Sequence, residues 1–368
     1  MRRGIMLWGL AALLLLTGCA QAGLPQAREM GDMALLRTMG VDAGEEPGQF
    51  SVTASTGRRA QGIEGSEAKP PLILSAQRDS LSGACLSMQG LSDHYVFFGY
   101  VDQLLIGESQ AQAGVRDILD YFARDLELGL GAQVWLIRDG TAGDAVRSGG
   151  ESGVERRLTT LNDDGEMGIS TINRTAGETL STLLEDGAAY LPALRVEPSE
   201  EEGQTALLDG GYGILTEGGL QGWLTGEAAR GLELLAGQEA QDVVEIDLPE
   251  GQVVVRITGA GLTLDPQREA GELTGARLRC EVAAEVAEAP DHLSEEELER
   301  VAAVLEELER KRAEAALTCL QLWQADCLAL GRQMTLAEFS LSPLGAEWGE
   351  RFARLEFTVQ VEAAIRQR

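Results

Sequence analysis

The chain has 368 residues, with 30 Lys and Arg residues against 59 Asp and Glu residues and a formal net charge of −29 at pH 7. A protein this acidic is not expected to bind nucleic acid, because phosphates are bound mainly by Lys and Arg. Hydrophobic residues make up 44% of the chain, which is ample material for buried cores, and the length suggests two or three domains.

The N-terminus has the pattern of an export signal. Arg2 and Arg3 precede an uncharged apolar run, Gly4–Leu16, which is too short to cross a membrane as a helix. The run ends in Leu16-Thr17-Gly18-Cys19, the pattern of a bacterial lipobox, in which the cysteine thiol is lipidated before cleavage. We predict a signal peptide at 1–18, lipidation of Cys19 and a tether at 19–23. The alternative is an ordinary signal peptide that happens to contain a cysteine. Two or three acyl chains anchor a protein stably.

After the tether, the sequence predicts strands that alternate with helices. The expected strands are 50–53, 72–76, 95–99, 103–106 and 133–137, and the expected helices are 26–36, 80–91, 107–122 and 177–190. In one of these helices, Val115, Ile118, Leu119 and Phe122 fall on a single face. The alternation predicts a mixed α/β region at 24–198, with any subdomain break near the turn-rich residues 139–153. The polar residues 57–71 are expected to form an exposed loop.

Residues 195–205 contain Pro198 and several Glu and Gln residues, which is typical of a linker, and a second domain is expected at 205–368. Its predicted strands are 211–215, 220–224, 243–248, 252–258 and 277–286, with a short helix at 227–235. Gly211-Tyr212-Gly213 lacks the third glycine of a dinucleotide fingerprint and is interpreted as turn geometry.

A long helix is predicted near the C-terminus. Ser294 and Glu297 have the spacing of a capping box. Apolar residues then follow in two stripes at helical spacing: Leu298, Val301, Leu305 and Leu308, and then, displaced by one position, Ala316, Leu320, Trp323, Cys327 and Leu330. We expect the helix to run from Ser294 to Gly331 and any break in it to fall near 310–313, where the stripe lapses. Alternating apolar residues from Phe352 to Val361 predict a long closing strand.

The residues that could carry chemistry do not form a recognisable site. His94 and His292 have no acidic or thiol partner at ligand spacing, and Ser66–Lys69 matches SxxK but lies in a polar loop before two prolines. The acidic pair Asp163–Asp164 and residues 199–202 are interpreted as solvated surface rather than a calcium site. We therefore predict no catalytic residue, no metal site and no cofactor.

Four cysteines follow Cys19, and sequence alone does not choose among their three pairings: Cys85, Cys280, Cys319 and Cys327. Because they lack CxxC spacing, and because a chain this long does not need disulfides for stability, buried free thiols are the favoured interpretation.

Several segments, in order and spacing, resemble the C subunits (GerAC-like lipoproteins) of bacterial spore germinant receptors. In the N-terminal half these are Leu-Leu-Ile-Gly-Glu at 104–108, Ala111, Gly114 and Asp-Tyr-Phe-Ala-Arg-Asp-Leu-Glu-Leu at 120–128. In the C-terminal half they are 210–215, 220–224, 227–231, 321–331, Pro343 and Trp348. The chain departs from the family pattern at Ala20-Gln21, Tyr100 and Gly129, where members usually carry Trp-Asp, His and Arg.

This resemblance implies an α+β, multi-domain lipoprotein of mixed helices and sheets, with a long C-terminal helix followed by a closing strand. It implies a non-catalytic accessory subunit, lipid-anchored to the cell membrane on the outer face of the spore inner membrane and required for nutrient-triggered germination. The implied partners are an A-type polytopic subunit and a B-type permease-like subunit. The alternatives are a solute-binding or a structural envelope lipoprotein.

Overall fold

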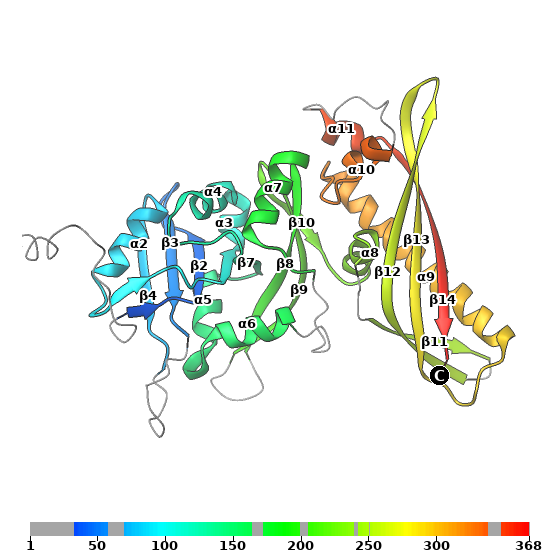
Figure 1. Ribbon diagram of the computed structural model, residues 1–368, viewed down its shortest axis with the longest axis horizontal. Helices are drawn as coiled ribbons and strands as arrows, with labels where there is room; N and C mark the ends of the chain where they lie inside the picture. Colours follow the sequence, from blue (N-terminus) through cyan, green and yellow to red (C-terminus); the bar gives the residue numbers. More distant parts are fainter. Residues whose placement is uncertain are drawn as a thin grey trace, which may run out of the picture. The chain divides into compact units, whose positions relative to one another are not determined.

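The N-terminal part of the chain is built on one eight-stranded sheet. The structure is a computed structural model that describes residues 33–57, 70–163, 172–198, 205–238, 242–249, 251–337 and 347–367. The sheet has the order β10-β9-β8-β7-β6-β2-β3-β4 (Figure 1). Its strands are β2 (Thr38–Ala43), β3 (Phe50–Ser55), β4 (Ile73–Arg78), β6 (Gln103–Gly107), β7 (Gln133–Arg138), β8 (Ala188–Pro198), β9 (Thr205–Thr216) and β10 (Gly219–Leu224).

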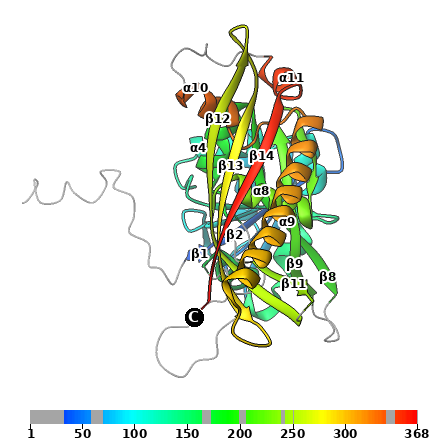
Figure 2. The same cartoon turned by 90° about the vertical axis from the view of Figure 1, so that its right-hand side faces the viewer.

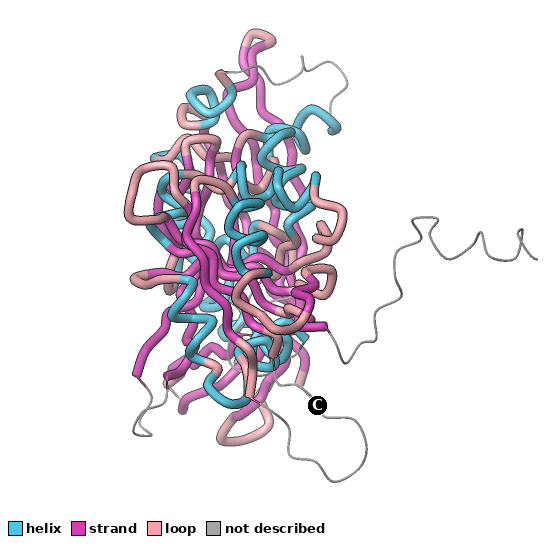
Figure 3. The backbone as a smooth tube through the Cα atoms, turned by 90° about the vertical axis from the view of Figure 1, so that its left-hand side faces the viewer, coloured by secondary structure: helices cyan, strands magenta, loops and turns pink. Residues whose placement is uncertain are grey.

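The four central strands, β2, β6, β7 and β8, are parallel, and antiparallel strands flank them on both sides. Successive residues of a strand point to opposite faces. Leu104 and Ile106 accordingly join one hydrophobic cluster, and Leu105 joins another. Helices cover both faces of the sheet, and Figure 3 distinguishes the helices from the strands by colour. On one face are α2 (Leu81–Gln89), α3 (Glu108–Ala113), α4 (Arg116–Arg124) and α7 (Ala176–Asp186), and on the other are α5 (Ala142–Ser148) and α6 (Val154–Asp163).

Local signals explain where several of these helices begin and end. Ser80 caps α2 by accepting a hydrogen bond from the N–H of Gly83. The single helix predicted at 107–122 is wrong, because Gly114 has a φ of 126° and divides the segment into α3 and α4. The predicted apolar face of that segment is nevertheless buried.

Two other sequence predictions need correction in this region. Met33–Leu35, expected to be helical, is strand β1, which pairs with β5 (Tyr95–Phe97); residues 26–32 lie outside the described residues. The turn-rich residues 139–153 contain helix α5 and a short 3-10 helix at Gly150–Ser152, and α6 was not predicted. The division of the chain into domains remains a prediction.

Strands β8 and β9 form an antiparallel pair from Ala188↔Thr216 to Pro198↔Thr205, so both ends of the predicted linker lie in strands. Gly211 has a φ of 78° and lies next to an irregularity in this pairing, where the register shifts between Ala193 and Leu194. The interpretation of Gly211–Gly213 as turn geometry is therefore wrong, whereas the strand predicted at 211–215 is correct: the segment lies inside β9.

The C-terminal part has a four-stranded sheet of order β11-β12-β13-β14. Strands β11 (Asp242–Leu248), β12 (Gly251–Glu269) and β13 (Glu272–Glu288) are antiparallel, and β14 (Glu356–Arg366) pairs in parallel with β13. The long helix α9 (Glu295–Leu322) runs beside β14 (Figure 2), and the N–H of Ala363 donates to Glu306 Oε1. Helix α8 (Glu227–Leu235) packs against α9.

The long C-terminal helix is confirmed, together with its predicted capping box at Ser294 and Glu297. Its predicted extent is wrong: α9 is continuous through 310–313 and ends at Leu322, before α10 (Leu330–Ala337) and α11 (Trp348–Phe352). Gln324 and Ala329, with φ of 56° and 54°, lie in the segment that separates α9 from α10. Phe352, expected in the final strand, belongs to α11. Within the described ranges, no helix is long and apolar enough to cross a membrane.

Candidate functional site

The predicted lipidation site, Cys19, lies outside the described residues, as do the signal peptide at 1–18 and the tether at 19–23. The same holds for Ser66–Lys69, for 199–202 and for the side chains of Asp163 and Asp164. These sequence interpretations remain predictions.

The four cysteines after Cys19 are free thiols, as predicted; three are buried and Cys319 is partly exposed. Burial raises the pKa of Cys85 to about 11 and that of Cys280 to about 12, and it also raises the pKa of Cys327. Because the thiolate is the nucleophilic form, the raised pKa values disfavour reaction of these three thiols near neutral pH. In the part of the chain that the structure describes, no three His, Cys, Asp or Glu side chains are grouped to hold a metal ion.

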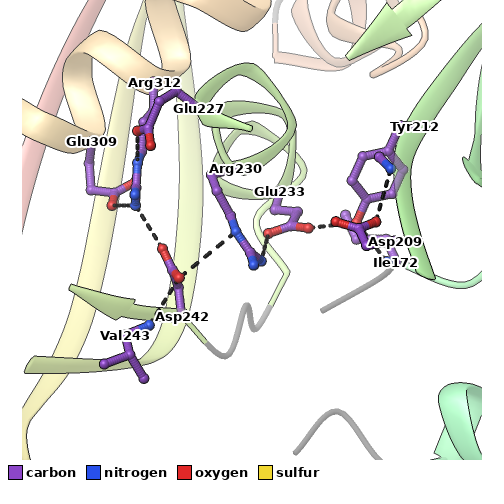
Figure 4. Close-up of polar contacts among 11 residues, drawn as sticks. Ile172, Asp209, Tyr212, Glu227, Arg230, Glu233, Asp242, Val243, Glu309 and Arg312 are labelled. Carbon is purple, nitrogen blue, oxygen red and sulfur yellow. Dashed lines mark hydrogen bonds and ion pairs between the residues drawn. The ribbon is translucent and has the colours of Figure 1, made fainter. Parts of the chain in front are cut away.

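The structure does bring together a set of buried charged side chains that the sequence did not predict as a group (Figure 4). At one end, Tyr212 on β9 donates from its hydroxyl to Glu233 Oε1 on α8 at 2.7 Å and accepts from the N–H of Ile172 at 2.8 Å. Glu233 Oε2 pairs with Arg230 Nη1 at 2.9 Å, and the Glu233 side chain is only 2% exposed. Burial raises the pKa of Glu233, although Arg230 and the Tyr212 hydroxyl oppose the shift.

The other end of the network is centred on Arg312 of α9. Its guanidinium reaches Glu309 Oε1 at 2.7 Å, Asp242 Oδ2 at 2.8 Å and Glu227 Oε2 at 2.5 Å. Arg230 Nε lies 3.9 Å from Asp242 Oδ1 and joins the two ends. Burial raises the pKa of Glu309, with Arg312 opposing the shift.

Helices α8 and α9 approach closely at this network. A Cβ atom on Gly231 would lie 1.9 Å from the backbone oxygen of Arg312, so glycine is required there. The apolar stripe of α9 is interrupted by two charged residues, Glu309 and Arg312. They lie on the buried face of the helix, where they form an ion pair with each other. Two opposite charges three residues apart inside an apolar stripe were the sequence signal for this network.

The network is suited to structural support rather than catalysis. Its carboxylates and guanidiniums pair with one another, and the void among them is about 10 Å³, which is room for about one water molecule. The network connects β9, α8, β11 and α9.

A second buried carboxylate, Asp326, organises the segment after α9. Its oxygens accept from the N–H of Leu330 at 2.8 Å, the N–H of Gly331 at 2.7 Å and Trp348 Nε1 at 2.9 Å. Burial raises the pKa of Asp326, and the three donors oppose the shift. Asp326 and Trp348 lie in two separate segments that carry the family resemblance, and their contact was not predicted.

The N-terminal signature residues are also structural. Glu127 accepts from the hydroxyl of Tyr95 at 3.0 Å and from the N–H of Phe98 at 3.1 Å. Glu108 accepts from Trp223 Nε1 at 3.2 Å and from the N–H of Asp139 at 2.7 Å. Signature segments far apart in the sequence therefore contact each other directly.

Comparison with known proteins gives two family matches. Residues 26–196 match the spore germination protein N-terminal domain, and residues 210–368 match the C-terminal domain described as spore germination B3/GerAC like. No curated protein sequence matches the chain. Among solved structures, the crystal structure of the GerBC protein is similar in fold, with a TM-score of 0.55 and 14% identity, over 89% of this chain and 97% of that one. The match bears out the mixed α/β fold with a long helix before the C-terminal strand.

Proposed function

This chain belongs to the GerAC-like family of spore germination proteins, and on that premise we propose that it is the membrane-anchored accessory C subunit of a nutrient germinant receptor. The observation that carries the proposal is the pair of family matches, which together span both parts of the chain behind a lipobox ending at Cys19. The family matches support the role in germination, and the lipobox supports the membrane anchor.

In this proposal the protein is lipidated at Cys19 and held to the outer face of the spore inner membrane. Its partners are the A-type polytopic subunit and the B-type permease-like subunit. The strongly acidic chain would be repelled by anionic lipid, so the acyl chains rather than the protein surface provide membrane attachment.

The proposed role is non-catalytic. Two sets of buried charged groups that the structure describes are engaged with one another or with N–H donors, around Arg312 and at Asp326. Such contacts stabilise the fold and leave its outer surface for binding partner subunits.

The test uses spores that carry Cys19→Ala, a full deletion, or Cys319→Ala as a matched control at a partly exposed thiol. We expect Cys19→Ala and the deletion to abolish dipicolinate release triggered by nutrients to which wild-type spores respond. Germination by exogenous dipicolinate should remain intact, and Cys319→Ala should behave as wild type. The Cys19→Ala protein should also leave the membrane fraction.

An unchanged nutrient response in the deletion strain, in a background without a paralogue, would contradict the receptor role and favour a solute-binding or structural envelope lipoprotein. If the response were lost but the Cys19→Ala protein stayed in the membrane fraction, the result would contradict membrane attachment through Cys19. It would leave the proposed receptor role in place.

A further inference from the structure

A polar pocket lies beside the buried charge network. We call it the Arg174 pocket; it has a volume of about 260 Å³ and a mostly polar surface. Its lining includes Arg174, Tyr190, Leu235, Gln238, Leu328 and Gln333. The volume approaches the lower end of the ~300–1,000 Å³ range of small-molecule sites. The pocket is therefore large enough for a compact metabolite, in contrast to the void inside the network.

Among the described residues, no carboxylate is paired with the cation in this pocket. The guanidinium carbon of Arg174 lies 4.2 Å from the centroid of the Tyr190 ring, and Arg174 Nε is buried without a hydrogen-bond partner. No acidic side chain is among the described residues of the lining. Arg138 also lies over an aromatic ring, at 5.7 Å from the centroid of Trp223, and its Nε also has no hydrogen-bond partner. It differs from Arg174 in having Asp139 at 3.6 Å. A guanidinium that lines a pocket with no carboxylate in the described lining favours an anionic ligand there.

The charge and shape of the donors define the ligand class. The pocket lining contains a single guanidinium, which balances one negative charge, and the chain as a whole has a net charge of −29. A phosphate dianion is therefore disfavoured as the ligand. The planar guanidinium fork matches a carboxylate. The Gln238 amide can bond hydroxyl groups, and the Tyr190 phenol interacts with Arg174. Gln333 keeps its amide oxygen available while its Nε2 donates to the backbone oxygen of Leu328. We propose that the Arg174 pocket binds a small hydroxylated monocarboxylate.

The pocket adjoins the buried network. The Tyr190 ring packs edge-on against Tyr212 at 5.9 Å, and the Tyr212 hydroxyl bonds Glu233. The lining comes from the residue Arg174 before α7, from β8, from the C-terminal end of α8 and the residues after it, from β12 and from the segment around α10. A bound carboxylate would thus contact both the eight-stranded sheet and the elements that follow it.

The proposal is tested by isothermal titration of the purified full-length chain in detergent with D-glycerate and D-gluconate. The matched neutral probes are glycerol and D-glucitol, which replace the carboxylate with a hydroxymethyl group. We expect saturable binding of at least one carboxylate and no detectable binding of its neutral counterpart. Arg174→Gln should weaken binding roughly tenfold to a hundredfold, the loss expected when a charge-assisted hydrogen bond is removed. Arg138→Gln, the matched control, should bind as wild type.

A second variant tests the proposal independently, in case Arg174→Gln does not fold. Gln238 is exposed, so Gln238→Glu should fold normally while it adds a negative charge at the pocket and weakens carboxylate binding several-fold. Absence of carboxylate binding by the wild-type chain, equal binding of the neutral probes, or unchanged binding by both Arg174→Gln and Gln238→Glu would each overturn the proposal.

Discussion

Replacement of Arg312 by Met is the most direct perturbation of the buried network. Arg312 is 10% exposed and its partners Glu309 and Asp242 are 3% and 15% exposed, so the variant would leave two buried carboxylates without their main cation. Removal of one partner of a buried ion pair costs about 3–5 kcal/mol. Glu227 is 64% exposed and adds little. Two effects limit the cost: Asp242 still has Arg230 at 3.9 Å, and Glu309, whose pKa is raised by burial, can take up a proton. We therefore expect the free energy of unfolding to fall by about 3 kcal/mol at neutral pH and by less in mild acid.

Urea denaturation followed by circular dichroism measures this loss. Arg310→Met is the matched control: Arg310 lies on the same helix and pairs with Glu307 and Glu314, but at the exposed surface, so its denaturation midpoint should hardly change. The double variant Arg312→Met/Glu309→Leu should recover part of the loss, because it removes the unpaired carboxylate with its cation. A loss below about 1 kcal/mol for Arg312→Met, or strictly additive losses in the double variant, would refute the reasoning.

Three further predictions concern stability. Gly231→Ala places a Cβ atom 1.9 Å from the backbone oxygen of Arg312, so α8 and α9 must separate; we expect a loss of about 1–3 kcal/mol by urea denaturation, and an unchanged midpoint would contradict the close approach. Ser294→Ala removes the hydroxyl that caps α9 and should cost about 1 kcal/mol in the same assay, whereas no loss would mean that the cap is dispensable. Burial raises the pKa of Glu233 above its ordinary value of 4.5, so the folded chain binds more protons than the unfolded chain between the two pKa values, and stability falls as pH rises through that window. The thermal midpoint should therefore be higher at about pH 5.5 than at about pH 8, and Glu233→Gln should reduce the difference; a midpoint that rises with pH would show the opposite linkage.

Elements specified by local sequence were predicted well. Helix α8 has the predicted bounds, Glu227–Leu235, and both hydrogen bonds of the Ser294–Glu297 capping box are formed. These features depend on residues within a few positions of each other, so sequence spacing contains the information that determines them.

Features that depend on tertiary contacts were missed. Helix α5 begins in a turn-rich segment, and its N-terminal N–H groups at Ala142 and Gly143 donate to Asp42, about a hundred residues earlier, at 2.7 and 2.8 Å. The apolar stripe lapses near 310–313, where any break was expected to fall, yet α9 is continuous there because Glu309 and Arg312 are buried as a pair. Periodicity alone treats such charges as solvent-facing. The Arg174 pocket also joins segments distant in sequence, and no motif marks it.

The pairing of β8 with β9 has a consequence for dividing this protein. Each strand provides the other with its backbone partners, along the register from Ala188↔Thr216 to Pro198↔Thr205. Two fragments produced separately on either side of 199–204 would each present an unpaired strand edge, a template for aggregation. Mixed together, the same fragments would complement each other through that edge. The chain should therefore behave as a split protein whose halves reassemble, rather than as two modules joined by a spacer.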